Sequence, residues 1–257
     1  MQEPVIGKLA AGLASGRAQI TGWLSLSEPS LAELFAREGC DAVTLDMQHG
    51  AYDFAGASRA IIAVAAAGKP SMVRIPVGEY STASRLVDAG AAGIIAPMVN
   101  SAAEARRFVS FLKFPPLGER SWGPRATQPL SGLEGGAYLT GANALIQAIA
   151  MIETREALDA LDEIVATPGV DGVFVGPSDL SIALSDGKKV DPHGPEVDAA
   201  LERIVATTNA HGKYAGLFCF DGARVKAAGA RGFAIATLGS DLILMRAVAR
   251  AELAAAR

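Results

Sequence analysis

The sequence predicts an α/β protein folded as a TIM (β/α)8 barrel. Eight short apolar segments alternate with amphipathic or Ala-rich segments along the 257 residues, an order and a length that are typical of this barrel. Most of these segments are continuously apolar, which indicates parallel strands covered on both faces. The alternative is an open doubly wound sheet, but that fold normally has a Gly-rich loop after its first strand, and "WLSLSEPS" (23–30) contains no glycine.

Each apolar segment is short enough for a barrel strand. We expect strands at residues 19–26, 41–48, 71–77, 92–99, 145–153, 172–177, 214–220 and 232–238. The helical segments between them often end in Gly just before the next strand, which is a common helix stop. A last helix follows at residues 240–257, so one barrel domain is expected over residues 1–257, with a long Gly- and Pro-rich loop at about 115–143.

Composition excludes several classes of protein. A net charge of -4 without basic clusters argues against nucleic acid as a partner. The longest apolar run, "AIIAVAAAG" (60–68), is too short to cross a membrane, and the first residues do not resemble a signal peptide. Cys40 and Cys219 form neither a disulfide framework nor a zinc-type motif. We therefore expect a soluble, cytoplasmic protein.

Polar residues cluster at the C-terminal ends of the expected strands, where barrels of this type carry their chemistry. They follow or end strands 2, 3, 5 and 6, and comprise Asp46, Gln48, His49, Arg74, Glu153 and Asp179. Alternation along strand 2 directs Thr44, Asp46 and Gln48 to the barrel interior, and His49 follows just past the strand. The sequence therefore predicts one polar site at this end of the barrel, with His49 partly buried.

Glu153 and Asp179 end sequential strands and should be neighbours. Two carboxylates at an apolar barrel end repel each other unless a cation lies between them, and Mg²⁺ or Mn²⁺ often uses only one or two carboxylates. The structural alternative is an exposed helix residue at Glu153 and a helix N-cap at Asp179. We favour the metal site.

Arg74 and His49 are the other candidates for chemistry. A buried guanidinium needs an acidic partner, which Asp46 can provide, or an anionic ligand, and we favour a substrate oxyanion or carboxylate. His49 suits a general acid or base, whereas His193 and His211 fall on expected surfaces. No lysine occupies the C-terminal end of a strand, which argues against a Schiff-base aldolase. Asp241 near the last strand disfavours a phosphorylated substrate.

Several motifs together resemble a known family. They are "LDMQHG" (45–50), "VRIP" (73–76), "APMV" (96–99), "FPPLGERSWG" (114–123), "IETREA" (152–157) and "VDGVFVGPSDLS" (170–181). The chain resembles, over nearly its whole length, the metal-dependent class II pyruvate aldolases of the 4-hydroxy-2-oxoheptanedioate and 2-keto-3-deoxy sugar acid aldolase type, within the superfamily of citrate lyase β-subunits. The resemblance implies a barrel of the phosphoenolpyruvate/pyruvate-binding type whose C-terminal helix is swapped between subunits of a trimer or hexamer.

The same resemblance implies roles for particular residues. Glu153 and Asp179 match the ligands of a divalent metal ion (Mg²⁺, Mn²⁺ or Co²⁺). Catalysis falls to His49 as the base, Arg74 as the group that stabilises the transition state, and Asp88 as the acid that tunes the histidine. Asp88 ends a helix at the opposite end of its own barrel, so it can reach a His49 only across a subunit boundary; the alternative is a salt link at the helix end.

The expected substrates are a 2-oxo acid and an aldehyde. The resemblance implies that a 4-hydroxy-2-oxo acid is cleaved reversibly to pyruvate, or a related 2-oxo acid, and an aldehyde through a metal-stabilised enolate, as in aromatic or sugar acid catabolism. Substrate contacts are expected from Arg74, Gly176, Pro177, Ser178 and Asp179, with Trp23, Leu217 and Phe218 forming an apolar surface for the aldehyde.

Two positions depart from the family pattern, and other functions stay open. Gln48 replaces a common Glu before the histidine, and Met151, which faces inward, replaces a substrate-binding Gln. The alternatives are a decarboxylase or acyl-CoA lyase that uses the same enolate, or a non-catalytic oxo-acid-binding protein. An acyl-CoA lyase should need a basic groove, for which only Arg120 and Arg125 are nearby.

Overall fold

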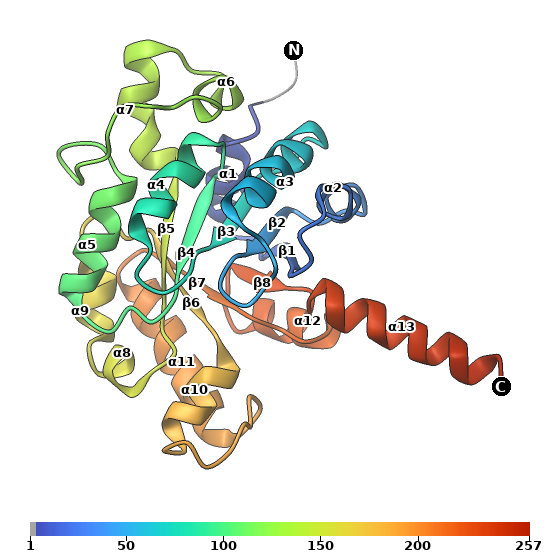
Figure 1. Ribbon diagram of the computed structural model, residues 1–257. Coiled ribbons are helices and arrows are strands. Elements are labelled where there is room, and N and C mark those ends of the chain that lie inside the picture. The colour runs from blue at the N-terminus through green and yellow to red at the C-terminus, as the bar shows by residue number, and fades with distance from the viewer. Residues whose placement is uncertain (1–3) are drawn as a thin grey trace.

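Eight parallel strands close into a barrel surrounded by helices (Figure 1). The computed structural model describes residues 4–257. Each strand pairs with the next along the chain, and β1 pairs with β8 to complete the ring. The strands are β1 Gln19–Leu24, β2 Ala42–Asp46, β3 Ser71–Arg74, β4 Gly93–Ala96, β5 Gln147–Met151, β6 Gly172–Val175, β7 Tyr214–Leu217 and β8 Ile235–Thr237. The predicted barrel and all eight strand positions are confirmed, although each strand is shorter than expected.

The helices alternate with the strands on the outside. They are α1 Gly7–Ala14, α2 Pro29–Arg37, α3 Phe54–Ala66, α4 Tyr80–Asp88, α5 Ala102–Leu112, α6 Thr127–Ser131, α7 Gly135–Leu145, α8 Arg155–Asp159, α9 Leu161–Ala166, α10 Pro177–Leu184, α11 Pro195–Ala210, α12 Gly222–Ala230 and α13 Asp241–Ala255. Helix α1 precedes the barrel and covers its N-terminal end, where Leu13 borders the same hollow as Gln147 and Tyr214.

The strand register decides which side chains fill the barrel. Asp46 pairs with Arg74 across β2 and β3, and Met151 pairs with Phe174 across β5 and β6. Paired residues of neighbouring strands point to the same side, so these four side chains face inward together. Lower in the barrel the hydroxyls of Thr21 and Thr44 lie 2.7 Å apart. The inward direction predicted for Thr44, Asp46 and Met151 is therefore confirmed.

The segment at residues 115–143 differs from the expected long loop, because it contains α6 and the first part of α7. Its glycines and prolines suggested irregular structure, but tertiary packing overrides that local preference. Tyr138 of α7 is fully buried against Phe114, with ring centroids 6.3 Å apart, and Asn143 hydrogen-bonds both the amide and the carbonyl of Phe114. These contacts fold the segment onto the barrel.

Helix α13 projects from the barrel (Figure 1), and several of its apolar side chains are exposed. Met245, Val248 and Leu253 are each more than half exposed. Its first residue is by contrast firmly held: Asp241 is fully buried and accepts hydrogen bonds from the amides of Ser25 and Leu26. Within residues 4–257 no helix is long and apolar enough to span a membrane.

Gly216 of β7 should be essential to the barrel interior. A Cβ there would lie 2.5 Å from Cδ2 of Phe174 and 3.3 Å from Cβ of Ile235, and neither group can move far in a packed core. We expect Gly216→Ala to lower the free energy of unfolding by about 1–3 kcal/mol in urea denaturation. Gly136→Ala is the matched control, since nothing lies within 4 Å of that Cβ position. Equal losses in both variants would contradict the prediction.

Candidate active site

A cavity of about 200 Å³ lies at the C-terminal ends of the strands. Its lining residues come from β1, β2, β3, β5, β6 and β7 or the turns after them, and comprise Trp23, His49, Arg74, Met151, Phe174, Gly176, Pro177, Ser178, Asp179 and Phe218. Most of the predicted site residues therefore meet in one place, as parallel strands of a closed barrel require.

Arg74 and Asp46 form a buried, two-pronged ion pair in the floor of this cavity. Arg74 Nε donates to Asp46 Oδ1 at 2.9 Å, and Nη2 donates to Oδ2 at 2.6 Å. Trp23 donates from Nε1 to the same carboxylate at 3.3 Å, and the guanidinium lies 4.9 Å from the Trp23 ring centroid. Asp46 is therefore the acidic partner of Arg74 that the sequence allowed, and the guanidinium still borders the cavity.

The acid of this pair stays ionised. Burial alone would raise the pKa of Asp46, but the hydrogen bonds and charge of Arg74, with the amides of His49 and Gln48, hold that pKa below its ordinary value. The two hydrogen bonds of this pair thus hold the Arg74 guanidinium in one orientation at the edge of the cavity. Gln48 contributes its amide, while its side-chain Oε1 is buried without a partner among the described residues.

Glu153 follows β5 and is almost fully buried, so it is not the exposed helix residue of the structural alternative. Its Oε1 accepts a hydrogen bond of 2.9 Å from the amide of Met98. Met98 has a φ of 55°, in the left-handed region that a non-glycine residue seldom adopts. Burial raises the pKa of Glu153 to about 7; the Met98 amide opposes the rise, the Asp179 charge adds to it and the Arg74 charge opposes it.

Asp179 lies in the first turn of α10, one turn above Gly176. Gly176 itself is the N-cap, so the carboxylate of Asp179 does not have the N-cap role of the structural alternative. A Cβ at Gly176 would lie 2.7 Å from Glu153 Oε2 and 3.7 Å from Asp179 Oδ2. The glycine therefore keeps open a space that two carboxylate oxygens flank.

These two carboxylates fit a divalent cation that prefers oxygen ligands. One oxygen of Glu153 is occupied by the Met98 amide, and the other faces the space above Gly176. A cation there would relieve the cost of burying Glu153 in its charged form. Among residues 4–257 no group of three or more His, Cys, Asp and Glu side chains is placed to hold a metal, so water or substrate would complete the coordination.

His49 borders the cavity but is exposed, whereas the sequence led us to expect a partly buried ring. The chain turns sharply after β2, because the amides of Gln48 and His49 both bond back to Asp46 Oδ1. This turn directs residue 49 outward over the cavity. His193 and His211 are exposed as predicted.

Asp88 lies away from this cavity, at the C-terminal end of α4, which leads into the start of β4. Its Oδ1 accepts from Arg120 Nη2 at 2.5 Å, and its carbonyl accepts from the amide of Ala126 at 2.9 Å. The helix-end salt link considered from the sequence is thus present. Within one chain Asp88 and His49 are at opposite ends of the barrel, as predicted.

The apolar wall differs from the prediction at one residue. Leu217 does not line the cavity, because it pairs with Val175 and Ala236 while Gly216 takes the inward position. Phe218 lines the cavity, as predicted. Trp23 is buried within this wall and lines the cavity, as predicted.

Sequence reasoning missed Phe174 of β6, although period-two alternation in "GVFVGP" (172–177) would have directed it inward with Gly176. It also missed the Met98 amide, because a backbone donor in a left-handed conformation leaves no sequence signal at a non-glycine residue.

The surroundings of one cysteine, Cys219, and one lysine, Lys113, make both unsuited to chemistry at this cavity. Burial raises the pKa of Cys219 to about 12, so its thiol is a poor nucleophile. Burial also lowers the pKa of Lys113, but its ammonium donates to Asn143, Ile146 and Asp171 at the N-terminal ends of the strands. Lys113 therefore lies away from the cavity, and no lysine is among the described residues that line it.

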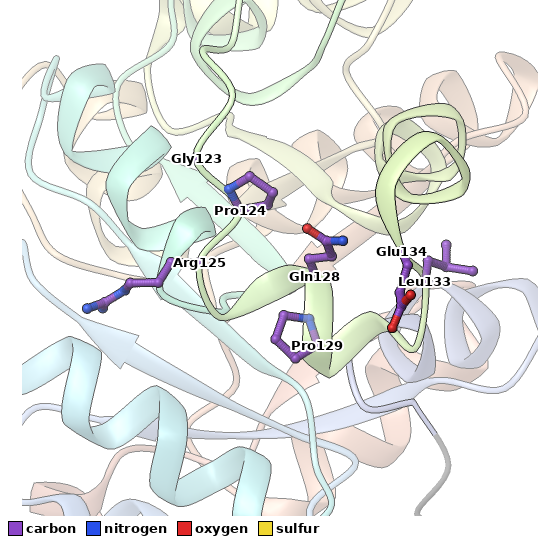
Figure 2. Close-up of a pocket in the computed structure, with 7 residues that line it drawn as sticks. All are labelled: Gly123, Pro124, Arg125, Gln128, Pro129, Leu133 and Glu134. Atoms are coloured by element: carbon purple, nitrogen blue, oxygen red, sulfur yellow. The ribbon is translucent and has the colours of Figure 1, made fainter.

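Larger hollows exist elsewhere, but they contain fewer charged side chains that are available to a ligand. One of about 500 Å³ lies over residues 123–134, where Arg125 extends away from the other labelled side chains and Glu134 is the one acid (Figure 2). Another of about 480 Å³ includes Asp88 and Arg120, which already bond to each other. The smaller cavity alone combines Arg74 with the carboxylates above Gly176.

The sequence model of the HpcH/HpaI aldolase/citrate lyase family matches residues 19–247. The chain belongs to this family. Since the matched range runs from β1 into α13, the whole barrel is shared. The resemblance to pyruvate aldolases and citrate lyase β-subunits is therefore confirmed. Family membership makes the protein a lyase.

Known relatives agree with this assignment. A hydroxypyruvate/pyruvate aldolase of Rhizorhabdus wittichii is 42% identical over 242 residues, covering 94% of this chain and 95% of its own. The crystal structure of a HpcH/HpaI aldolase/citrate lyase family protein from Burkholderia cenocepacia has a TM-score of 0.86 and 30% identity, covering 98% of this chain and all (100%) of its own. A citrate lyase β-subunit of M. tuberculosis, complexed with oxaloacetate and magnesium, shares the fold at a TM-score of 0.55, with 20% identity over 86% of this chain and 91% of its own.

In this family member, loss of the Asp46 charge should be costly. Asp46→Asn would leave a buried guanidinium without its counter-charge, so we expect the free energy of unfolding at pH 7 to fall by about 3 kcal/mol. Asp46 has a lowered pKa when folded; its contribution is therefore complete above its unfolded pKa, near 3.8, and disappears as pH falls through the lower folded value. Urea denaturation at several pH values measures the difference.

The matched control is Asp186→Asn. This carboxylate lies 3.3 Å from Arg155, but its side chain is 68% exposed, so less than about 1 kcal/mol should be lost. A loss at Asp46 no larger than at Asp186 would disprove the assigned importance of the buried pair.

Proposed function

We propose that this protein is a metal-dependent class II aldolase that reversibly cleaves 4-hydroxy-2-oxo acids to pyruvate, or a related 2-oxo acid, and an aldehyde. The main support is one arrangement: the oxygens of Glu153 and Asp179 flank the space above Gly176 in the same cavity as Arg74. A 2-oxo acid carries a carboxylate and a keto oxygen side by side, which suits such a polar corner. The hydroxypyruvate/pyruvate aldolase name of the R. wittichii relative is consistent with this substrate class.

Glu153 and Asp179 are the proposed ligands of Mg²⁺, Mn²⁺ or Co²⁺, and magnesium in the M. tuberculosis citrate lyase β-subunit supports this choice. When bound, such an ion would supply Lewis-acid stabilisation of negative charge on the 2-oxo oxygen. The Met98 amide holds one oxygen of Glu153 and so leaves the other directed to the substrate space. Met151 beside it offers no amide or hydroxyl group, so the substrate hydrogen bond that the family's Gln would make is either missing or supplied by another residue.

Arg74 is proposed to donate a hydrogen bond to the oxyanion that develops on the substrate. Its Nε and Nη2 are engaged by Asp46, which leaves Nη1 without a side-chain hydrogen bond to any described residue. A guanidinium locked by its acid needs little reorganisation when charge develops nearby. The amide of Ser178 in the first turn of α10 is proposed to bind the substrate carboxylate, since amides at the start of a helix favour anions.

His49 is proposed as the base that moves protons to and from the substrate. An exposed ring above the cavity can take the proton of the 4-hydroxyl during cleavage, or a methyl proton of pyruvate during synthesis. Asp88 would tune this histidine from a neighbouring subunit, since it lies at the opposite end of its own barrel. An acyl-CoA lyase is less well supported, because Arg120 is buried and already bonds to Asp88 and Tyr138, so its charge is satisfied within the protein.

Deuterium exchange at the pyruvate methyl group, followed by NMR, tests the proposal directly. We expect wild-type protein to exchange in the presence of Mg²⁺ or Mn²⁺, and EDTA to abolish exchange. His49→Ala should slow exchange by roughly 10²–10⁴-fold, the usual contribution of a general base. If no metal supports exchange, the aldolase proposal is wrong, and a non-catalytic oxo-acid-binding protein is favoured.

Metal binding measured by calorimetry separates the two groups of residues. Glu153→Gln should lose Mn²⁺ binding, because it removes the buried charge that the ion balances, whereas His49→Ala should retain it. His211→Ala, at an exposed position that contacts Asp162, is the control for a general effect of losing a histidine.

We further propose that the protein is a homo-oligomer, a trimer or hexamer, in which α13 packs on another subunit. The exposed apolar side chains of this helix support it. The double variant Met245→Lys, Val248→Lys should therefore elute as a smaller species in size-exclusion chromatography with light scattering. Glu252→Lys places the same side chain at an already charged position of α13 and should keep the wild-type mass. An unchanged mass in the double variant would contradict this role of α13.

A further inference from the structure

The turn that carries His49 packs directly on the segment that follows β1. A Cβ atom at Gly50 would lie 3.0 Å from both the Cα atom and the carbonyl oxygen of Ser25, and 2.2 Å from the carbonyl oxygen of Asp46. The amide of Ala51 donates to the Ser25 carbonyl at 2.7 Å. The residues that follow His49 are therefore held by Ser25, while the amide of His49 itself is held by Asp46.

A buried carboxylate from the last helix holds Ser25 in turn. Asp241, the first residue of α13, is fully buried. The amide of Ser25 donates to both of its carboxylate oxygens at 3.0 Å, and the amide of Leu26 donates to Oδ2 at 2.8 Å. A buried carboxylate is costly unless it is hydrogen-bonded, so these amides are firmly bound to it. Asp241 thus fixes the backbone on which the His49 turn packs.

Asp241 has a defined position because α13 begins there. Ser240 caps the helix, with its Oγ accepting from the amide of Ile243 at 3.3 Å, and the amide of Leu242 donates to Asp241 Oδ1 at 2.8 Å. An acidic side chain in the first turn of a helix is also favoured by the helix dipole. Hydrogen bonds therefore connect the start of α13 to the segment after β1, and that segment to the turn at residues 49–51.

We infer that Asp241 is a positioning residue that sets the place of His49 above the cavity, through Ser25 and the turn at residues 49–51. This role rests on the proposed function, in which His49 is the base. Neither Asp241 nor Ser25 lines the cavity, and Glu153 and Asp179 follow other strands. Loss of the Asp241 contact should therefore impair proton transfer and spare metal binding.

Asp241→Asn tests this role, since it keeps the shape of the side chain but replaces one acceptor oxygen with an amino group. We expect kcat for exchange of the pyruvate methyl protons to fall roughly 10- to 100-fold, because a misplacement of about 1 Å can cost that much. KM for pyruvate and the Kd for Mn²⁺, the latter from calorimetry, should stay within about twofold of wild type.

Amide hydrogen exchange followed by mass spectrometry tests the contact itself. The peptide that covers residues 47–53 should exchange faster in Asp241→Asn, because the Ala51 amide loses its fixed acceptor. Asp221→Asn is the matched control: this carboxylate also lies at a helix start after a barrel strand and accepts from the amide of Arg224 at 2.8 Å, but it is exposed. It should change neither kcat nor the exchange of this peptide.

A double variant distinguishes positioning of His49 from general damage to the fold. In the His49→Ala background, Asp241→Asn should alter the remaining methyl exchange by less than about twofold, since the side chain that it positions is gone. If Asp241→Asn does not fold, Ala51→Pro removes the amide that bonds Ser25 at an exposed position, and the same fall in kcat with retained Mn²⁺ binding is expected.

An unchanged kcat in Asp241→Asn (or in Ala51→Pro, where that variant is used), or an equal loss with and without His49, would overturn this role of Asp241 while wild-type methyl exchange upheld the aldolase proposal. Absence of methyl exchange in the wild-type protein would contradict the proposed function instead. Amide exchange of residues 47–53 would then still decide whether Asp241 holds this turn.

Discussion

Closure of eight parallel strands into one ring is the constraint on which the rest of this structure depends. Because every strand runs the same way, every strand end that carries a polar residue reaches the same end of the barrel. The register then requires Asp46 and Arg74 to face inward side by side. Residues separated by more than a hundred positions in the chain, such as Trp23 and Phe218, thereby share one cavity.

The two ends of the barrel treat buried charge in opposite ways. At the N-terminal ends of the strands, Lys113 is saturated by two carbonyls and by Asp171, so its charge is satisfied within the protein. At the other end, Asp46 and Arg74 satisfy each other, but Glu153 has a single backbone donor and a raised pKa. A bound ligand can supply the partner that the Glu153 carboxylate lacks, so chemistry is expected at this end of the barrel only.

Two glycines and one residue in the left-handed conformation determine the shape of the cavity and the direction of its polar groups. Gly176 leaves room where a methyl group would meet Glu153 Oε2, and the left-handed Met98 aims its amide at the other oxygen of the same carboxylate. Gly216 does the same for the apolar side, because only a residue without Cβ leaves space for the Phe174 ring. The cavity is thus shaped as much by absent side chains as by those present.

The sequence by itself determined the barrel, the order of its strands and most of the residues at its polar end, since these depend on hydrophobic periodicity and on short motifs. Only the tertiary structure decided what happens past the strand ends and in the long insertion. Packing of Tyr138 on Phe114 holds α7, residues 135–145, against the barrel despite its glycines, and the register of β7 turned Leu217 outward. The bonds to Asp46 turned His49 toward solvent. Such features depend on contacts between distant segments, and periodicity within one segment carries no record of them.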